Sequence, residues 1–464
     1  MSEPPTASGF ASEAQPHRRT RWGGIADSGL QPTGFFRIGE QRNRFWLVDP
    51  LGGKFISKGI NNVRLDSDTV QNTSRIPYSD ACFRKYRDRS SWRRAIANRM
   101  LGWGFNTLGC WSDDVVAYVG YRPLAITPTI DVTRSFRAHR PEQLLFPDVF
   151  DPEFEGHVRH SARVSCSGWQ RNPNILGIFS DNELHWSPNG AGGEELLTLF
   201  LNLPRGRQGR AVATDFLQQR YRDFDSFNGI WQTPAKSWEQ LASLSAIAQP
   251  YSRAPFTPDD TLERKADQID PRRAAFSADC DAFSGIVADR YFDITVSAIK
   301  AADPNHLVIG CRFRSPPSAQ VLSAAASYLD VISFNFYGFD PTAQVDFYAR
   351  AGKPCVISEF SFRAEDSGLP NTIGAGPLVA NQSERARCFD RYVTTALRNP
   401  AMVGYHWFEH ADEPREGRPD GENSNYGMVT IEDNEYEPFS SSLCTANERI
   451  ELVHEKSVST ATPA

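Results

Sequence analysis

Two apolar stretches of this 464-residue chain end abruptly in polar side chains, and each polar end carries a glutamate. The stretch 175–179 is followed by Ser-Asp-Asn-Glu, which ends at Glu183, and the stretch 354–357 is followed by Ser358 and Glu359. A carboxylate at the end of an apolar run loses hydration energy unless it is paired or used in function. The first cluster alone would serve equally well to cap a helix. Because the second stretch ends in the same way, the pattern favours acid–base or nucleophilic catalysis by two carboxylates.

Both apolar stretches are predicted to be buried strands of a parallel sheet. In α/β folds the catalytic residues lie at the carboxyl ends of such strands, which is where the two glutamates stand. Eight apolar runs of this kind alternate with helical patterns along the chain. They cover residues 55–62, 105–111, 124–130, 175–179, 307–313, 331–337, 354–360 and 403–410. The sequence therefore predicts an α/β fold, a closed (β/α)₈ TIM barrel. Segments 35–38 and 44–48 flank a polar turn and predict a short β-hairpin before the barrel.

The domain organisation follows from where the apolar patterns begin and end. Residues 1–30 and 456–464 are polar and are predicted to be disordered tails around a single catalytic barrel, residues 31–455. Residues 187–279 form an insertion between the fourth and fifth strands that is much longer than one crossover helix requires. Because it leaves from the strand that carries Glu183, we expect it to form a lid or wall of the site.

Bulk composition limits the classes of partner. With 40% hydrophobic and 23% charged residues, the chain is typical of a soluble globular protein, and its net charge of -6 gives no electrostatic reason to expect nucleic acid or a membrane surface as partner. The eight cysteines lack metal-ligand spacing, so neither a metal nor a cofactor is expected. The first residues lack the apolar core of a secretory signal, which makes the cytoplasm the expected location.

Two carboxylates at a barrel mouth meet the requirements of glycoside hydrolysis. One carboxylic acid protonates the leaving oxygen while a carboxylate acts on the opposite side of the anomeric carbon. The segments Asn182-Glu183 on the fourth strand and Ser358-Glu359-Phe360 on the seventh resemble the catalytic motifs of clan A glycoside hydrolases. The resemblance implies that Glu183 is the acid/base and Glu359 the nucleophile of a retaining mechanism.

The same resemblance assigns roles to two aromatic residues. Tyr337 closes the sixth strand, where clan members place a tyrosine that hydrogen-bonds the nucleophile. Trp407 on the eighth strand resembles the aromatic platform beneath the reacting sugar, and an indole face suits the C–H face of a pyranose. For both residues, packing in the barrel core is the alternative.

Further motifs resemble a narrower group. Residues 45–50, 59–62, 303–307, 310–313 and 407–429 are similar to those of the β-agarases of glycoside hydrolase family 50. The resemblance implies hydrolysis of β-linked, galactose-containing oligosaccharides of the agarose type by a two-glutamate double displacement. Family members usually carry an additional carbohydrate-binding β-domain at the N-terminus, and here about thirty polar residues stand in that place.

We expect a set of polar and aromatic residues near the strand ends to bind the sugar. Polar side chains of a binding site discriminate between substrates, because a side chain that is left without its hydroxyl partner costs binding energy. The predicted substrate-binding residues, besides Tyr337 and Trp407, are Asn62, Trp111, Asn182, Arg312, Asn335, Glu422 and Asn423. The sequence is equally compatible with other roles. Trp111 could pack in the barrel core, and the loop residues could have a structural role in their loops.

Two alternatives remain open at this point. The chain could have another clan A activity, as a β-galactosidase, β-glucosidase or β-mannanase, or it could be a sugar-binding barrel that has lost catalysis. The presence of both carboxylates argues against a simple binding protein, because a protein that only binds sugar has no need to hold two like charges close together. The expected partner is an oligosaccharide or polysaccharide, with exo-action on short chains expected, and the sequence leaves the oligomeric state unknown.

Overall fold

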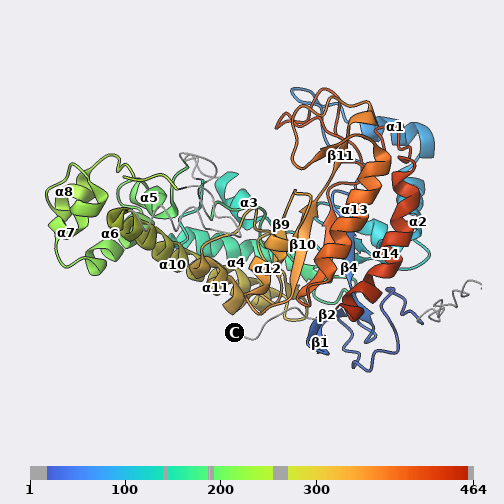
Figure 1. Cartoon of the computed structure of the whole chain (residues 1–464), viewed down its shortest axis with the longest axis horizontal. Coiled ribbons are helices and arrows are strands. Elements are labelled where there is room, and N and C mark those ends of the chain that lie inside the picture. The colour runs from blue at the N-terminus through green and yellow to red at the C-terminus, as the bar shows by residue number, and fades with distance from the viewer. Residues whose placement is uncertain (1–17, 139–144, 187, 189–192, 254–269, 458–464) are drawn as a thin grey trace, which may run out of the picture.

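The computed structural model describes residues 18–138, 145–186, 188, 193–253 and 270–457 (Figure 1). Its central feature is a set of parallel strands that pair around a ring. One sheet has the order β6-β5-β4-β13-β10-β9, and a second pairs β7 with β8. Parallel bridges Ile126↔Ile175 and Phe313↔Phe334 join the two sheets at both ends, so the pairing closes through eight strands. The predicted α/β fold with a parallel sheet is confirmed.

Each predicted strand run overlaps one strand of the ring, and most of these strands are shorter than the run. The observed bounds are β4 (Ser57–Ile60), β5 (Thr107–Leu108), β6 (Ala125–Ile126), β7 (Gly177–Ile178), β8 (Leu307–Val308), β9 (Ile332–Asn335), β10 (Cys355–Phe360) and β13 (Met402–Trp407). Because all eight strands are parallel, their carboxyl ends lie at one end of the ring, where the loops that follow them meet.

Helices surround the ring and bury their apolar faces against it. They are α1 (Pro77–Tyr86), α2 (Arg89–Gly102), α3 (Val132–Ala138), α4 (Pro152–Cys166), α11 (Ala319–Tyr328), α12 (Thr342–Ala349), α13 (Gln382–Leu397) and α14 (Phe439–Lys456). Between β5 and β6 the connection is a single 3₁₀ turn, Asp114–Tyr118. The described helices include none long and apolar enough to cross a membrane.

The amino end of the barrel is closed by a small antiparallel sheet. The predicted hairpin is present as β1 (Arg37–Gln41) and β2 (Arg44–Val48), and β3 (Lys54–Phe55) pairs with β2. Trp22, Phe36 and Leu47 pack in one cluster with side chains from the barrel interior. This sheet and the segment before it therefore plug the end of the ring opposite the strand ends that carry the glutamates.

The prediction that residues 1–30 form a disordered tail is wrong for residues 18–30. Trp22 is 1% exposed, and the backbone of Ile25 exchanges hydrogen bonds of 2.8 and 3.0 Å with Lys54. Further contacts hold the segment: Ile25 is 5% exposed, and the Arg122 side chain donates to the Trp22 carbonyl at 2.7 Å. Such long-range contacts give no periodic pattern in the sequence. Residues 1–17 and most of the predicted C-terminal tail, 458–464, lie outside the described residues, and α14 extends to Lys456.

The insertion between β7 and β8 lies to one side of the barrel. It contains α5 (Leu196–Leu201), α6 (Gln208–Arg220), α7 (Phe224–Trp231) and α8 (Trp238–Ser243), and it leads into the long helix α10 (Pro271–Ala302). In Figure 1 these helices extend to the left, away from β10 and the loops around β11 (Arg363–Ala364). Aromatic contacts such as Phe200–Phe283 and Trp231–Phe276 hold them on α10.

The expected lid is therefore not found in the described part of the insertion. Among residues 193–253, none lines the cavity that holds the two glutamates. The physical reason is that the amphipathic helices bury their apolar faces on α10, which continues past the barrel and provides an apolar surface there. Residues 187, 189–192 and 254–269 lie outside the described residues.

Candidate active site

A cavity of about 1040 Å³ opens at the carboxyl ends of the strands. It is large enough for several sugar rings, since typical ligand pockets measure about 300–1,000 Å³. Both predicted catalytic residues, Glu183 and Glu359, line it. Six further residues predicted for substrate binding line the same cavity: Asn62, Trp111, Asn182, Asn335, Tyr337 and Glu422. Residues far apart in the sequence thus meet at one site.

Glu359 is the buried member of the carboxylate pair. It lies on β10, its side chain is 7% exposed, and one oxygen is 2.7 Å from Nη2 of Arg312. The other oxygen accepts a hydrogen bond of 2.7 Å from the Tyr337 hydroxyl. Burial raises the pKa of Glu359 to about 7; Arg312 and the Tyr337 hydrogen bond act to lower it, and Glu183 acts to raise it. The site therefore holds a partly desolvated carboxylate with two donors that stabilise its anionic form.

Glu183 is the accessible member, with a side chain 26% exposed. Strand β7 ends at Ile178, and Glu183 itself has a left-handed φ of 51°. The turn explains how the adjacent residues Asn182 and Glu183 both line the cavity, since neighbours on a regular strand point to opposite faces. Nε of Arg314 lies 3.9 Å from one Glu183 oxygen.

Asn335 connects the two carboxylates. Its Nδ2 donates to Glu183 at 2.9 Å and lies 3.3 Å from Oδ1 of Asn182. Its Oδ1 accepts a hydrogen bond of 2.7 Å from the hydroxyl of Ser358, the residue before the buried glutamate. This contact fixes which end of the amide faces Glu183. The two halves of the site are therefore held in register by one side chain on β9.

Arg312 does not take the predicted role of binding sugar hydroxyls. It is fully buried and does not line the cavity. Besides its ion pair with Glu359, its Nη2 donates to the Ser358 carbonyl at 2.9 Å, and its guanidinium lies 4.6 Å from the centroid of the Trp111 ring. A buried carboxylate needs a nearby countercharge, so Arg312 supports Glu359 from behind. The sequence could not distinguish this role from a sugar contact.

The prediction that Trp407 forms the sugar platform is wrong. Its ring is fully buried between the barrel and the helices, 5.3 Å from Phe360 and 5.4 Å from Phe439, and its Nε1 donates to the Tyr426 carbonyl at 2.9 Å. The next residue, Phe408, points the other way and lines the cavity beside Tyr426, as expected from alternation along a strand. Phe336, Phe408 and Tyr426 are the aromatic cavity residues that the sequence prediction missed.

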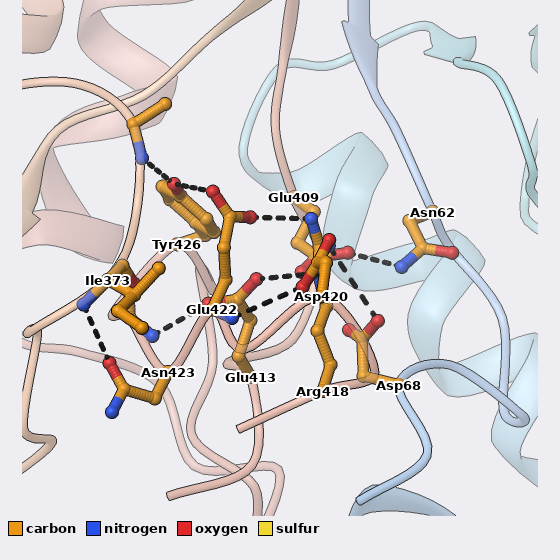
Figure 2. Close-up of polar contacts among 12 residues, drawn as sticks. Asn62, Asp68, Ile373, Glu409, Glu413, Arg418, Asp420, Glu422, Asn423 and Tyr426 are labelled. Carbon is orange, nitrogen blue, oxygen red and sulfur yellow. Dashed lines mark hydrogen bonds and ion pairs between the residues drawn. The ribbon is translucent and has the colours of Figure 1, made fainter. Parts of the chain in front are cut away.

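Asn423 also has a role other than the predicted one. Its Oδ1 accepts hydrogen bonds of 3.0 and 3.1 Å from the backbone N–H groups of Thr372 and Ile373 (Figure 2). It does not line the cavity. The residue therefore holds the loop after β10 against the loop after β13, which is the structural alternative that the sequence left open.

An acidic cluster around Arg418 forms one wall of the cavity (Figure 2). Nε of Arg418 lies 2.9 Å from Asp420 and 3.1 Å from Glu413, its Nη2 lies 2.5 Å from Glu422, and its Nη1 is 3.9 Å from Asp68. Burial raises the pKa of Glu413 above its usual value, while Arg418 and the Ser424 N–H act to lower it.

Asn62 reaches the same cluster through Glu409. Its amide donates to Glu409, which is fully buried, and burial together with Asp68 raises the pKa of Glu409 well above its usual value. Asn62 itself borders the cavity with a left-handed φ of 55°. In the described part of the chain there is no group of three or more side chains that could hold a metal ion.

Comparison with known proteins finds β-agarases that are similar over nearly the whole chain. The chain is 27% identical to β-agarase B of Vibrio sp. (strain JT0107) over 96% of its own length and 51% of the relative's, and 26% identical to β-agarase A of the same organism over 90% and 46%. The chain thus spans about half the length of these relatives. No family model matches it.

Solved structures of agarases share the fold of this chain. The structure of an exo-β-agarase superposes with a TM-score of 0.77 at 24% identity, covering 94% of this chain and 68% of that one. A second agarase structure superposes with a TM-score of 0.75 at 25% identity, covering 94% and 68%. The chain is therefore similar to β-agarases both in sequence and in fold. This similarity confirms the resemblance to β-agarases that the motifs indicated.

Proposed function

We propose that the protein is a retaining glycoside hydrolase that cleaves β-linked, galactose-containing oligosaccharides of the agarose type. The observation that carries the proposal is the asymmetry of the carboxylate pair. Glu359 is buried and receives two donors, from Arg312 and Tyr337, whereas Glu183 is accessible in the same cavity. A double displacement requires this division between a stabilised anion and a group that exchanges protons with substrate and water.

The first step joins the sugar to the enzyme. A Glu359 oxygen attacks the anomeric carbon, the bond to the glycosidic oxygen breaks, and the Glu183 carboxyl gives its proton to that oxygen. As the new ester forms, negative charge leaves Glu359. Arg312 and Tyr337 hold the oxygens of Glu359 before attack and so fix the orientation of the nucleophile.

The second step releases the sugar. Glu183, now a carboxylate, takes a proton from a water molecule whose oxygen attacks the anomeric carbon, and the ester bond to Glu359 breaks. Asn335 holds Glu183 in place for both proton transfers through its 2.9 Å hydrogen bond. Two inversions at one carbon give net retention of the β configuration.

The substrate class rests on similarity and on the shape of the cavity. The relatives over nearly the whole chain are named β-agarases, and the loop after β13 supplies Arg418, Asp420, Glu422 and Tyr426 to one wall of the cavity. A wall on one side favours binding of a chain end. We therefore propose exo-action on short oligosaccharides, supported by this loop and not by the insertion.

The experiment is hydrolysis of a defined ladder of agarose-type oligosaccharides, with NMR detection of the first anomer formed. The wild-type protein should release one small product with the β configuration. Glu359→Gln should lose turnover on all substrates, and Glu183→Gln should lose it on oligosaccharides far more than on aryl galactosides with good leaving groups. Exposed Glu40 on β1 gives the control variant Glu40→Gln, which should behave as wild type. An α anomer as first product, or near-normal turnover by Glu359→Gln, would refute the mechanism.

A further inference from the structure

Ser358, the residue before the buried glutamate on β10, is fully buried and does not line the cavity that holds the two glutamates. Its carbonyl oxygen accepts a hydrogen bond of 2.9 Å from Nη2 of Arg312 and another of 2.9 Å from Nδ2 of Asn61. Both donors are fully buried as well. The backbone of Ser358 is therefore held from two sides, and this fixes the point from which its hydroxyl acts.

The hydroxyl of Ser358 donates to Oδ1 of Asn335 at 2.7 Å, and Asn335 is 3% exposed. An amide oxygen only accepts and an amide nitrogen only donates. If the amide of Asn335 were turned over, its nitrogen would donate to the hydroxyl, and the hydroxyl proton of Ser358 would have no acceptor among the residues that the structure describes. Because a buried donor without an acceptor is costly, Ser358 favours the orientation in which Nδ2 of Asn335 faces Glu183.

This orientation makes the two oxygens of Glu183 different. Oε1 accepts the hydrogen bond of 2.9 Å from Nδ2 of Asn335, so Oε1 acts as the carbonyl oxygen when the carboxyl is protonated. Oε2 has no such donor from Asn335, and the nearest cationic atom to it is Nε of Arg314 at 3.9 Å. The proton that Glu183 carries therefore belongs on Oε2, which is free to face the substrate.

We propose that Ser358 is a positioning residue for the acid/base: through Asn335 it keeps Oε2 of Glu183 as the oxygen that gives and takes up the proton. The proposal rests on the proposed function and adds to it a residue that acts on the proton transfers without touching the substrate. Because Ser358 and Glu359 are adjacent on β10, one strand then sets the position of the nucleophile and the orientation of the acid/base.

Loss of the hydroxyl should impair both proton transfers. In Ser358→Ala, Oδ1 of Asn335 loses its donor, and either end of the amide can then face Glu183. With Oδ1 turned toward it, a protonated Glu183 donates its proton to Asn335 and holds it back from the glycosidic oxygen. After the first step, the same oxygen faces the Glu183 carboxylate, so that two acceptors oppose each other and the base is held out of position.

The test compares an agarose-type oligosaccharide with an aryl galactoside that has a good leaving group. On the oligosaccharide, Ser358→Ala should lower kcat/KM by about ten- to a hundredfold, which is part of the 10²–10⁴-fold that general acid–base catalysis supplies. On the aryl galactoside the first step needs little acid, so kcat/KM should stay within about twofold of wild type. There kcat should fall, because the second step still needs the base.

Azide supplies a second readout on the aryl galactoside. It attacks the anomeric carbon directly, the ester bond to Glu359 breaks, and Glu359 leaves as a carboxylate without any proton transfer. Adding azide should therefore restore kcat of Ser358→Ala and yield a β-galactosyl azide. Ser358→Cys replaces the hydroxyl by a weak donor of similar size, so it provides the same comparison if Ser358→Ala does not fold.

A double-mutant cycle shows whether Ser358 acts through Asn335. In an Asn335→Ala background, Ser358→Ala should cause no further loss on the oligosaccharide, because the link is already absent. Ser361 gives the matched control, since it is also a buried serine and its hydroxyl has no hydrogen-bond partner in the described part of the chain. Ser361→Ala should keep the wild-type rates on both substrates.

Three outcomes would overturn the proposal. An equal loss of kcat/KM on both substrates, or a further loss from Ser358→Ala in the Asn335→Ala background, would show a merely structural role while leaving the hydrolase function intact. Wild-type rates for Ser358→Ala on the oligosaccharide would have the same meaning. If the wild-type protein cleaved neither substrate, the hydrolase function and the role of Ser358 would be overturned together.

Discussion

Replacing Glu359 by glutamine tests how much stability the buried nucleophile costs the fold. Its pKa is about 7 in the folded protein, against 4.5 for an ordinary glutamate, and the cause is chiefly burial. A carboxyl whose folded pKa is raised contributes stability that is fully present below the unfolded pKa and is lost as the pH rises through the folded pKa. Ionisation of Glu359 should therefore lower the free energy of unfolding of the wild-type protein between about pH 4.5 and pH 7 and above.

The magnitude follows from the two pKa values. With 1.36 kcal/mol for each unit, the wild-type protein loses about 2.5 kcal/mol between pH 5 and pH 8 from this group alone. Glu359→Gln lacks the titration, so its stability relative to wild type should increase by about that amount over the same range. Arg312 stays charged over this range, and its attraction for ionised Glu359 is already contained in the pKa of about 7, so it adds no further pH dependence.

The assay is urea unfolding of the wild type and the variant at pH 5 and pH 8, followed by fluorescence. Exposed Glu40 again supplies the control, and Glu40→Gln should show no change of relative stability between the two pH values. A relative stability of Glu359→Gln that stays constant with pH would refute the reasoning, because it would show that burial does not raise the pKa of Glu359.

Three further outcomes are expected from single substitutions. Tyr337→Phe removes a donor to Glu359 and should raise the pKa of that carboxyl, moving the acid limb of the kcat/KM profile up by about one to two pH units; an unmoved limb would contradict the hydrogen bond. Trp407→Phe should lower the free energy of unfolding and leave KM unchanged. Phe408→Leu should raise KM severalfold and lower the free energy of unfolding by less than about 1.5 kcal/mol. The opposite pattern would show that Trp407 is the sugar platform after all. Trp22→Ala should cost about 3–5 kcal/mol in urea unfolding, and a negligible cost would show that residues 18–30 do not close the barrel.

The strands and the two glutamates were predictable for one physical reason. An apolar run that ends in charged side chains marks the point where a buried element reaches solvent, and parallel strands bring all such points to one end of the barrel. Glu183 and Glu359 were found from this local signal alone, and both line one cavity. This pattern does not indicate which residues from distant parts of the chain the two side chains contact.

The errors come from that missing information. Trp407 and Phe408 are adjacent aromatic residues, and only the packing of α13 and α14 decides that the larger ring faces the helices. Arg312 lies at a strand end like a sugar-binding residue, but its partner Glu359 comes from a strand 47 positions later in the chain. The insertion was expected to cover the site, but its helices bury their apolar faces on α10 instead.

The sequence by itself therefore determined the parallel α/β fold, the identity of the carboxylate pair and the resemblance to β-agarases, since each depends on residue types close together in the chain. The tertiary structure alone decided which glutamate is buried, which donors stabilise it, and which aromatic ring lines the cavity. These properties depend on desolvation and on contacts between distant segments, and the order of residues along the chain fixes them only through the completed fold.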